Sequence, residues 1–296
     1  MVKLAGLASP AKINLFLRVT GKRADGYHEL DSIFLPIALF DRVTVEMRSA
    51  ASRSITLRTG SHGIPLDGRN LAVRAASGFL NEFGFNSAVA IELDKEIPIG
   101  AGLGGGSSDA GAVLRLMSSL CRVEEARRLA ALALSIGADV PFFLEPKPAH
   151  VRGVGELIEP LERVQMMDFV IGVPSIEVST AEVFSHLRMP EWSGAASPKD
   201  IAAIEQGVVS AELVVNDLAQ PASRLHPAIE TLKVLVQKTG ASAVAMTGSG
   251  GAVFGLYAGP DEAQAACVDL TGKMPATRFL CVRSIAGSVD SKKARQ

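Results

Sequence analysis

A glycine-rich stretch, PIGAGLGGGSS, carries the residue types best suited to binding phosphate. Its members are Pro98, Ile99, Gly100, Ala101, Gly102, Leu103, Gly104, Gly105, Gly106, Ser107 and Ser108. Glycines leave backbone N–H groups uncovered, and a helix that follows adds unpaired N–H groups and the positive end of its dipole. Ser107 and Ser108 can cap that helix or donate to phosphate oxygens. The alternative is a tight strand-to-helix turn without a ligand, but this density of glycine followed by two serines favours phosphate.

Three well-known glycine motifs can be compared with this stretch. The Walker A motif requires a lysine directly after its last glycine, and none is present. Gly100, Gly102 and Gly105 match the dinucleotide pattern G-x-G-x-x-G, but the acids about 20 positions on, Glu124 and Glu125, begin another helix instead of ending a strand. The hydrolase pattern G-x-S-x-G does not occur. A kinase-type phosphate loop is what remains.

Lys12 and Asp139 are the candidate catalytic pair. Lys12 interrupts an apolar strand, where its ammonium could simply extend to solvent, and Asp139 could simply cap the short helix that starts near Pro141. Placed together, the carboxylate could orient an attacking hydroxyl or accept its proton, and the ammonium could hold the alkoxide or the transferring phosphoryl group. Asn14 lies two positions after Lys12, on the same strand face, and is a candidate hydroxyl partner or a strand-edge polar residue.

The elements that must position these residues alternate between strands and helices. Expected strands cover 9–19, 31–40, 42–48, 53–58, 87–93, 149–153, 156–160 and 169–174. Expected helices cover 70–83 with Asn70 as N-cap, Ser107 or Ser108 to Leu120, 123–136, a short turn after Pro141, and much of 179–238. The chain then reads strand, glycine turn (246–254), strand, helix and strand. We place a domain boundary near residue 160, which gives domains 1–160 and 161–296.

Composition narrows the class of protein. The 296 residues are 48% hydrophobic with a net charge of −1, so a large core is available and a nucleic-acid partner is disfavoured. Three widely spaced cysteines argue against a disulfide framework or zinc site and favour a reducing compartment. No apolar run approaches the ~20 residues of a membrane span. We therefore expect a cytoplasmic protein with no membrane association.

Four ordered segments resemble the GHMP kinases, the family of galactokinase, homoserine, mevalonate and phosphomevalonate kinases. They are PAKINLFLRVTGKRADGYHEL at 10–30, the glycine loop, GADVPFFL at 137–144 and MTGSGGAVFGLY at 246–257, and GVGE at 153–156 is a smaller match. The resemblance implies an α+β GHMP-kinase two-domain fold, with an N-terminal ATP-binding and catalytic domain, a C-terminal domain and the active site in the cleft between them. It also implies that Lys12 and Asp139 are catalytic.

The triple glycine followed by SSDA is most similar to members whose acceptor is a cytidyl diphosphate alcohol. The resemblance then implies ATP as co-substrate, Mg²⁺ with it, phosphorylation of the acceptor's 2-hydroxyl, Tyr27 and Phe184 around the base, His28 at its edge and Thr180 nearby. Without the resemblance, Tyr27 and His28 could also be a surface pair, and Phe184 could be a core residue. No metal ligand is identified, although Ser108 is a candidate contact. A GHMP kinase for another small alcohol and a non-enzymatic paralogue stay open, as does the choice between monomer and homodimer.

Overall fold

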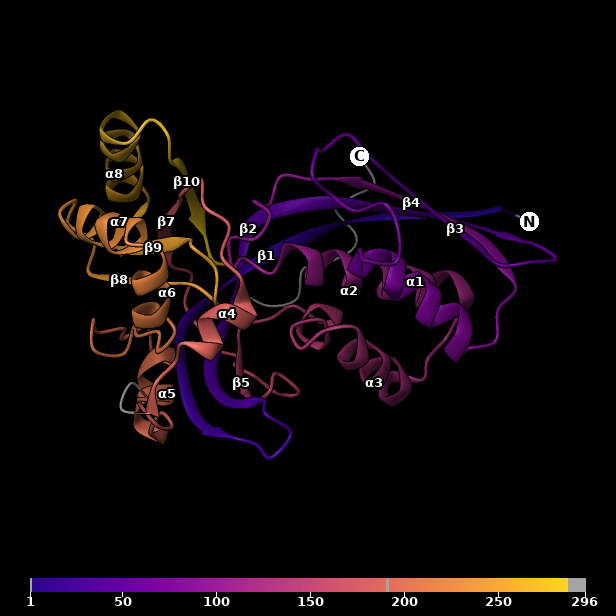
Figure 1. Cartoon of the computed structure of the whole chain (residues 1–296), viewed down its shortest axis with the longest axis horizontal. Helices are drawn as coiled ribbons and strands as arrows, with labels where there is room; N and C mark the ends of the chain where they lie inside the picture. Colours follow the sequence, from indigo (N-terminus) through magenta and orange to yellow (C-terminus); the bar gives the residue numbers. More distant parts are fainter. Residues whose placement is uncertain (1, 190–191, 287–296) are drawn as a thin grey trace.

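Two β-sheets form the framework of the chain, as the computed structural model shows for residues 2–189 and 192–286 (Figure 1). The strands of the first sheet are β1 (Val2–Lys22), β2 (His28–Ser49), β3 (Ser54–Thr59), β4 (Ser87–Asp94), β5 (Ala149–Gly153) and β6 (Leu157–Pro160). Those of the second are β7 (Asp168–Val173), β8 (Ala243–Met246), β9 (Val253–Tyr257) and β10 (Arg278–Arg283). The first sheet has the order β3-β4-β2-β5-β6 with β1 on β2, and the second has the order β10-β7-β9-β8.

Helices cover these sheets. They are α1 (Leu71–Glu82), α2 (Gly105–Cys121), α3 (Ala126–Ile136), the 3₁₀ turn η1 (Pro141–Leu144), α4 (Thr180–Ser185), α5 (Pro198–Glu205), α6 (Ala219–Leu225), α7 (Ala228–Gln237) and α8 (Pro260–Lys273). Helices α1, α2 and α3 lie along one face of the first sheet, and α7 and α8 lie beside the second (Figure 1). The fold is α+β, as expected for a GHMP kinase.

The longest strands were expected to be shorter than they are. Strands 31–40 and 42–48 are one strand, β2, and β1 starts at Val2 instead of near residue 9. Asp41 reads as a break in the sequence, but it lies where β2 changes partner: β5 pairs with it as far as Phe34 and β4 pairs from Arg42 on. The β1–β2 register also shifts after Pro10, which bends the hairpin without ending it.

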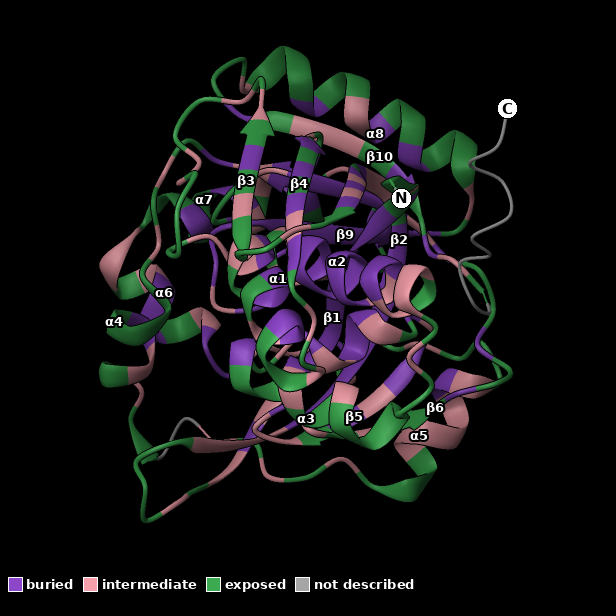
Figure 2. Ribbon diagram, turned by 90° about the vertical axis from the view of Figure 1, so that its right-hand side faces the viewer, coloured by how far each residue is buried: buried purple, intermediate pink, exposed green. Residues whose placement is uncertain are grey.

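The helix after the glycine loop is buried over much of its length (Figure 2). It begins at Gly105, two residues before Ser107, because Gly104 adopts a left-handed conformation (φ +73°) as its N-cap. Gly111 lets η1 pack directly on α2, since a Cβ there would lie 2.6 Å from the Cβ of Phe143. The predicted N-cap of α1 is confirmed, because the Asn70 side chain accepts from the Ala72 N–H at 2.9 Å.

The second half of β1 contacts the C-terminal half of the chain. Leu17 N donates to Val215 O at 2.8 Å, and Asp217 N donates to Leu17 O at 2.9 Å. One apolar cluster contains Ile13 of β1 together with Phe169 and Phe254 of the second sheet. The sheet changes between β6 and β7, and the domain division near residue 160 stays a prediction.

Candidate active site

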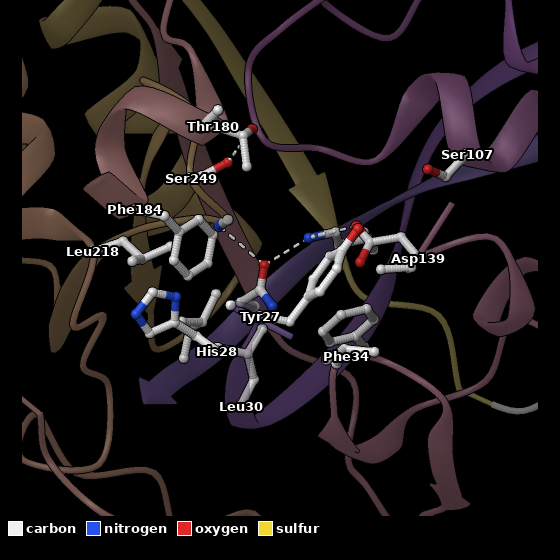
Figure 3. A pocket seen from close by; sticks show the side chains of 18 of the residues that line it. Tyr27, His28, Leu30, Phe34, Ser107, Asp139, Thr180, Phe184, Leu218 and Ser249 are labelled. Atoms are coloured by element: carbon white, nitrogen blue, oxygen red, sulfur yellow. Dashed lines mark hydrogen bonds and ion pairs between the residues drawn. The ribbon is translucent and has the colours of Figure 1, made fainter. Parts of the chain in front are cut away.

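A cavity of about 740 Å³ opens beside the middle of β1 (Figure 3). Residues from both halves of the chain line it, and they include every catalytic and substrate-binding candidate predicted from the sequence. Those seven are Lys12, Asn14, Tyr27, His28, Asp139, Thr180 and Phe184. Sequence reasoning missed others in the lining, among them Phe34 and Leu218, which carry no signal beyond an apolar side chain.

Lys12 and Asp139 meet at one side of this cavity. The Lys12 Nζ lies 3.4 Å from Asp139 Oδ2, and it lies over the Phe34 ring at 4.7 Å from the centroid. Lys12 comes from β1 and is only 3% exposed, whereas Asp139 comes from the turn between α3 and η1 and is 33% exposed. The ammonium is thus held in place, while the carboxylate keeps a face open to a ligand.

Asn14 is buried, and its side chain is already bonded to protein groups. Its Oδ1 accepts from Lys12 Nζ at 2.6 Å and from Gly248 N at 2.9 Å, and its Nδ2 donates to Ser32 Oγ at 2.9 Å. These bonds orient the Lys12 ammonium and fix the turn that starts at Thr247. Asn14 also lines the cavity, and its contact with a substrate hydroxyl stays a prediction.

The phosphate-loop candidates line a second, neighbouring cavity of about 440 Å³. All of Pro98–Ser107 contribute, together with Asn70, Lys95 and Asp109. Ser107 and Thr180 line both cavities, so the two are adjacent at these side chains.

Two glycine turns interlock at this point. Gly102 has φ +79°, and a Cβ there would overlap the Thr247 carbonyl and lie 3.0 Å from Gly250 N. A Cβ on Gly250 would in turn overlap the backbone of Ala101 and Gly102. Backbone bonds join the same segments, since Ala252 N donates to Ala101 O at 3.3 Å. The glycines of both turns therefore allow the main chains of the two halves to touch.

Ser108 lies outside both cavities. It is fully buried, its hydroxyl donates to Pro10 O at 2.6 Å, and it also bonds the Ser9 hydroxyl. Its N–H donates to Gly104 O at 2.8 Å. We expected both serines to face phosphate, but only Ser107 is so placed, because the helix turns the next side chain towards β1.

A buried charge cluster supports the second cavity, and sequence reasoning did not identify it. Lys95 Nζ donates to Asp109 Oδ2 at 2.7 Å and to Asp41 Oδ2, and Asp41 Oδ1 accepts from the N–H groups of Glu96 and Ile97. Burial raises the pKa of Asp109 to about 7; the Lys95 charge opposes the rise and the Asp41 charge adds to it. Asp41 is 54 positions from Lys95, and Lys95 and Asp109 lie 14 positions apart on either side of the glycine loop, so no local pattern marks the three together.

An aromatic group forms the opposite wall of the first cavity. The His28 ring stacks on Phe184 with centroids 5.2 Å apart and 23° between planes, and Trp192 meets His28 edge-on at 6.0 Å. Tyr27 is 65% exposed, and in Figure 3 its ring lies between the His28–Phe184 stack and Asp139. Burial, with a smaller effect from Lys22, lowers the pKa of His28, so its ring is neutral near pH 7 and can both donate and accept. Thr180 Oγ1 lies 2.6 Å from Ser249 Oγ, on the second glycine turn.

The chain matches two family models. Residues 70–146 match the GHMP kinases N terminal domain, and residues 199–276 match GHMP kinases C terminal. A 4-diphosphocytidyl-2-C-methyl-D-erythritol kinase of Anaeromyxobacter sp. (strain K) is 42% identical over 277 residues, which is 92% of this chain and 86% of that protein. One of Desulfotalea psychrophila is 40% identical over 85% of each chain.

Two solved structures resemble this chain over most of its length. A crystal structure of 4-(cytidine 5'-diphospho)-2C-methyl-D-erythritol kinase superposes with a TM-score of 0.81 at 37% identity, over 96% of this chain and all of that one. A homoserine kinase from Cytophaga hutchinsonii gives a TM-score of 0.75 at 18% identity over 96% and 95% of the two chains, which is a likeness of fold. Among the described residues, no helix has both the length and the apolar character needed to cross a membrane.

Proposed function

This chain belongs to the GHMP kinase family, and on that basis we propose that it transfers the γ-phosphoryl group of ATP to the 2-hydroxyl of 4-diphosphocytidyl-2-C-methyl-D-erythritol. That reaction is a step of the non-mevalonate route to isoprenoid precursors. The observation that supports it best is the meeting of two cavities at Ser107 and Thr180, one bounded by the glycine loop and the other holding Lys12, Asp139 and an aromatic wall.

The glycine loop is suited to the phosphates of ATP. Gly100, Gly102 and Gly104 all have positive φ and line the second cavity, and α2 begins directly after them. Unpaired N–H groups at a helix start and the helix dipole both attract phosphate oxygens. The γ-phosphate of a nucleotide seated on the loop would lie towards Ser107, where the acceptor cavity begins.

The Lys12–Asp139 pair is suited to the acceptor. The acceptor oxygen attacks the γ-phosphorus, its proton passes to the Asp139 carboxylate, and the bond from phosphorus to the β,γ-bridging oxygen breaks to release ADP. The Lys12 ammonium, held by Asn14 at 2.6 Å, is placed to stabilise negative charge on the oxygens in transfer. No covalent phosphoenzyme is required.

The aromatic wall is suited to a cytosine ring. Phe184 and Tyr27 offer flat faces for stacking, and a neutral His28 offers one donor and one acceptor to the polar edge of the base. Thr180, beside the second glycine turn, lies between this wall and the loop, so we assign it to the diphosphate end of the acceptor.

The residues present fit Mg²⁺ bound mainly through ATP. Magnesium takes oxygen ligands and commonly has one or two from the protein beside those of the phosphates. Ser107 lines both cavities, so its hydroxyl is available where the phosphates of ATP would meet the acceptor. The described ranges hold no group of three or more His, Cys, Asp or Glu side chains placed to form a metal cage. The ion would neutralise charge on the phosphates, and we assign Ser107 as its protein ligand in place of Ser108.

Two further proposals concern the setting of the enzyme. The three cysteines are free thiols, consistent with the cytoplasmic location that we propose. Whether the chain is a monomer or a homodimer stays a prediction that sedimentation would decide.

ADP release by the purified protein tests the assignment. We expect turnover with the cytidyl diphosphate acceptor and none above background with homoserine or mevalonate. Phe184→Ala is the matched variant: it should raise the KM for the cytidyl acceptor about tenfold through lost stacking while leaving the KM for ATP unchanged. Turnover with homoserine or mevalonate but not with the cytidyl compound would overturn the assignment while leaving the kinase activity in place.

A further inference from the structure

The turn between β5 and β6, Gly153–Glu156, lies at the edge of the acceptor cavity and has no role in the reaction described above. It is the GVGE segment of the sequence, and its Val154 lines the cavity. Gly153 and Gly155 have φ values of +73° and +123°, which are rarely adopted by other residues. Each glycine also packs closely against another group. Gly153 lies against the Glu156 carboxylate, and Gly155 lies against the Ala138 carbonyl.

The first approach holds the Glu156 side chain over its own turn. A Cβ on Gly153 would lie 2.7 Å from the Glu156 carboxyl carbon, so the carboxylate would have to leave this position if the residue were not glycine. Glu156 Oε2 accepts from Val154 N at 2.6 Å, and this bond fixes the carboxylate. The other oxygen, Oε1, accepts from Arg23 Nη2 at 2.8 Å.

Arg23 closes the loop that carries Tyr27 and His28. The backbone N–H of Arg23 donates to the Tyr27 carbonyl at 2.7 Å, and the Arg23 carbonyl accepts from Gly26 N at 3.0 Å. Its Nε also donates to Glu29 Oε1 at 3.1 Å, on the far side of the loop. The guanidinium therefore ties both ends of the loop to the Glu156 carboxylate.

The second approach brings the turn against the residue before Asp139. A Cβ on Gly155 would lie 2.6 Å from the Ala138 carbonyl oxygen. Ala138, Asp139 and Val154 line the same cavity as Tyr27 and His28. The turn is thus in contact with the catalytic carboxylate's peptide on one side and with the base-binding loop, through Arg23, on the other.

We propose that Arg23 and Glu156 are positioning residues, whose ion pair sets the loop carrying Tyr27 and His28 relative to Asp139. This inference rests on the proposed function of the site, because it concerns the distance between the bound base and the reacting hydroxyl. Stability is a poor explanation for the pair, since partly exposed ion pairs contribute little to it. A rigid spacing matters for catalysis because displacements near 1 Å are costly to the rate.

Arg23→Gln and Glu156→Gln test the proposal. Each should raise the KM for the cytidyl acceptor about tenfold, with the KM for ATP and the melting temperature unchanged. The double variant should be no worse than either single one, because both changes remove one interaction. Arg23→Lys keeps the positive charge but loses the planar guanidinium that bonds two groups at once. Its acceptor KM should lie between those of the wild type and Arg23→Gln.

Arg152→Gln is the matched control. It removes an exposed ion pair between Arg152 of β5 and Glu159 of β6, whose charged atoms lie 3.4 Å apart. Arg152 does not line the cavity. Its KM values should equal those of the wild type. Gly155→Ala addresses the other side of the turn and should lower kcat more than it raises the acceptor KM, because it presses on Ala138 next to Asp139.

Trp192, the one tryptophan of the chain, gives a readout that needs no substrate. Its ring meets His28 edge-on, so displacement of the loop should change its fluorescence in Arg23→Gln and Glu156→Gln but not in Arg152→Gln. Unchanged acceptor KM values in both variants, or equal rises in the acceptor and ATP KM values, would overturn the positioning role. If the wild type itself fails to phosphorylate the cytidyl acceptor, the proposed function fails, and Trp192 emission alone decides whether the pair positions the loop.

Discussion

Gly102→Ala and Gly100→Ala make a matched pair of changes within one loop. Both glycines have left-handed backbone angles, φ +79° and +69°, so an alanine at either costs about 1 kcal/mol in backbone strain. Their surroundings differ. A Cβ at position 100 meets nothing within 4 Å, whereas one at position 102 overlaps the Thr247 carbonyl and lies 3.0 Å from Gly250 N.

The overlap sets the size of the expected effect. In Gly102→Ala the two glycine turns must separate by about 1 Å, and overpacking of that kind costs about 1–3 kcal/mol beyond the backbone strain. A 1 Å displacement of a binding loop can cost ~10²-fold in rate, which is about 2.7 kcal/mol of transition-state binding. We expect kcat/KM for ATP to fall by that factor in Gly102→Ala and by less than about fivefold in Gly100→Ala.

ADP release at saturating acceptor, with ATP varied, measures this difference, and thermal unfolding measures the cost in stability. Gly100→Ala should melt about 2–4 °C below wild type, and Gly102→Ala should melt lower still. Calorimetric titration with ATP tests the loop without any acceptor. Equal ATP affinity and equal melting temperature in the two variants would show that the close approach of the turns does not hold the loop.

Three further changes test other parts of the site. Asp139→Asn should lower kcat at least ~10²-fold while calorimetry finds ATP binding unchanged, and wild-type rates would remove Asp139 from the mechanism. Asn14→Ala leaves Lys12 and the Gly248 N–H without their buried acceptor, so unfolding should require about 1–3 kcal/mol less; an unchanged melting temperature would contradict the bonds described. Asp109 keeps its proton up to about pH 7 when folded but loses it near pH 4 when unfolded, so its contribution to stability falls as the pH rises through that window. Asp109→Asn lacks this loss and should gain on wild type between pH 4 and pH 7 in urea unfolding; parallel curves would refute the raised pKa.

Local patterns in the sequence predicted the parts of the fold that depend on neighbouring residues. Asn70 precedes a periodic apolar run, and it caps α1 as expected. The glycine loop was also recognisable from the sequence, because the groups that would bind phosphate are backbone groups of consecutive residues. The start of α2 was placed two or three residues late, since glycine is a poor helix former and the close packing of Phe143 and Lys12 against Gly104 involves residues distant in sequence.

Side chains that bond across the chain were beyond such reasoning. The Asn14 acceptor oxygen bonds the backbone N–H of Gly248, 234 positions away, a partner that its position in β1 could not predict. Lys95 belongs to no motif singled out in the sequence, yet it lies between Asp41 and Asp109 in the interior. Burial and pairing of this kind arise only when distant segments pack, so composition and spacing carry no trace of them.

The interlocked glycine turns also affect when the protein can first work during its synthesis. Residues 98–108 leave the ribosome long before Thr247 and Gly250, the residues against which Gly102 packs. A nascent chain that has completed its first sheet therefore has the phosphate loop's sequence without the backbone that supports its shape. Nucleotide binding should appear only once the chain extends past β9, which pairs with β8 and closes the second turn. Chains released before that point would accumulate without consuming ATP.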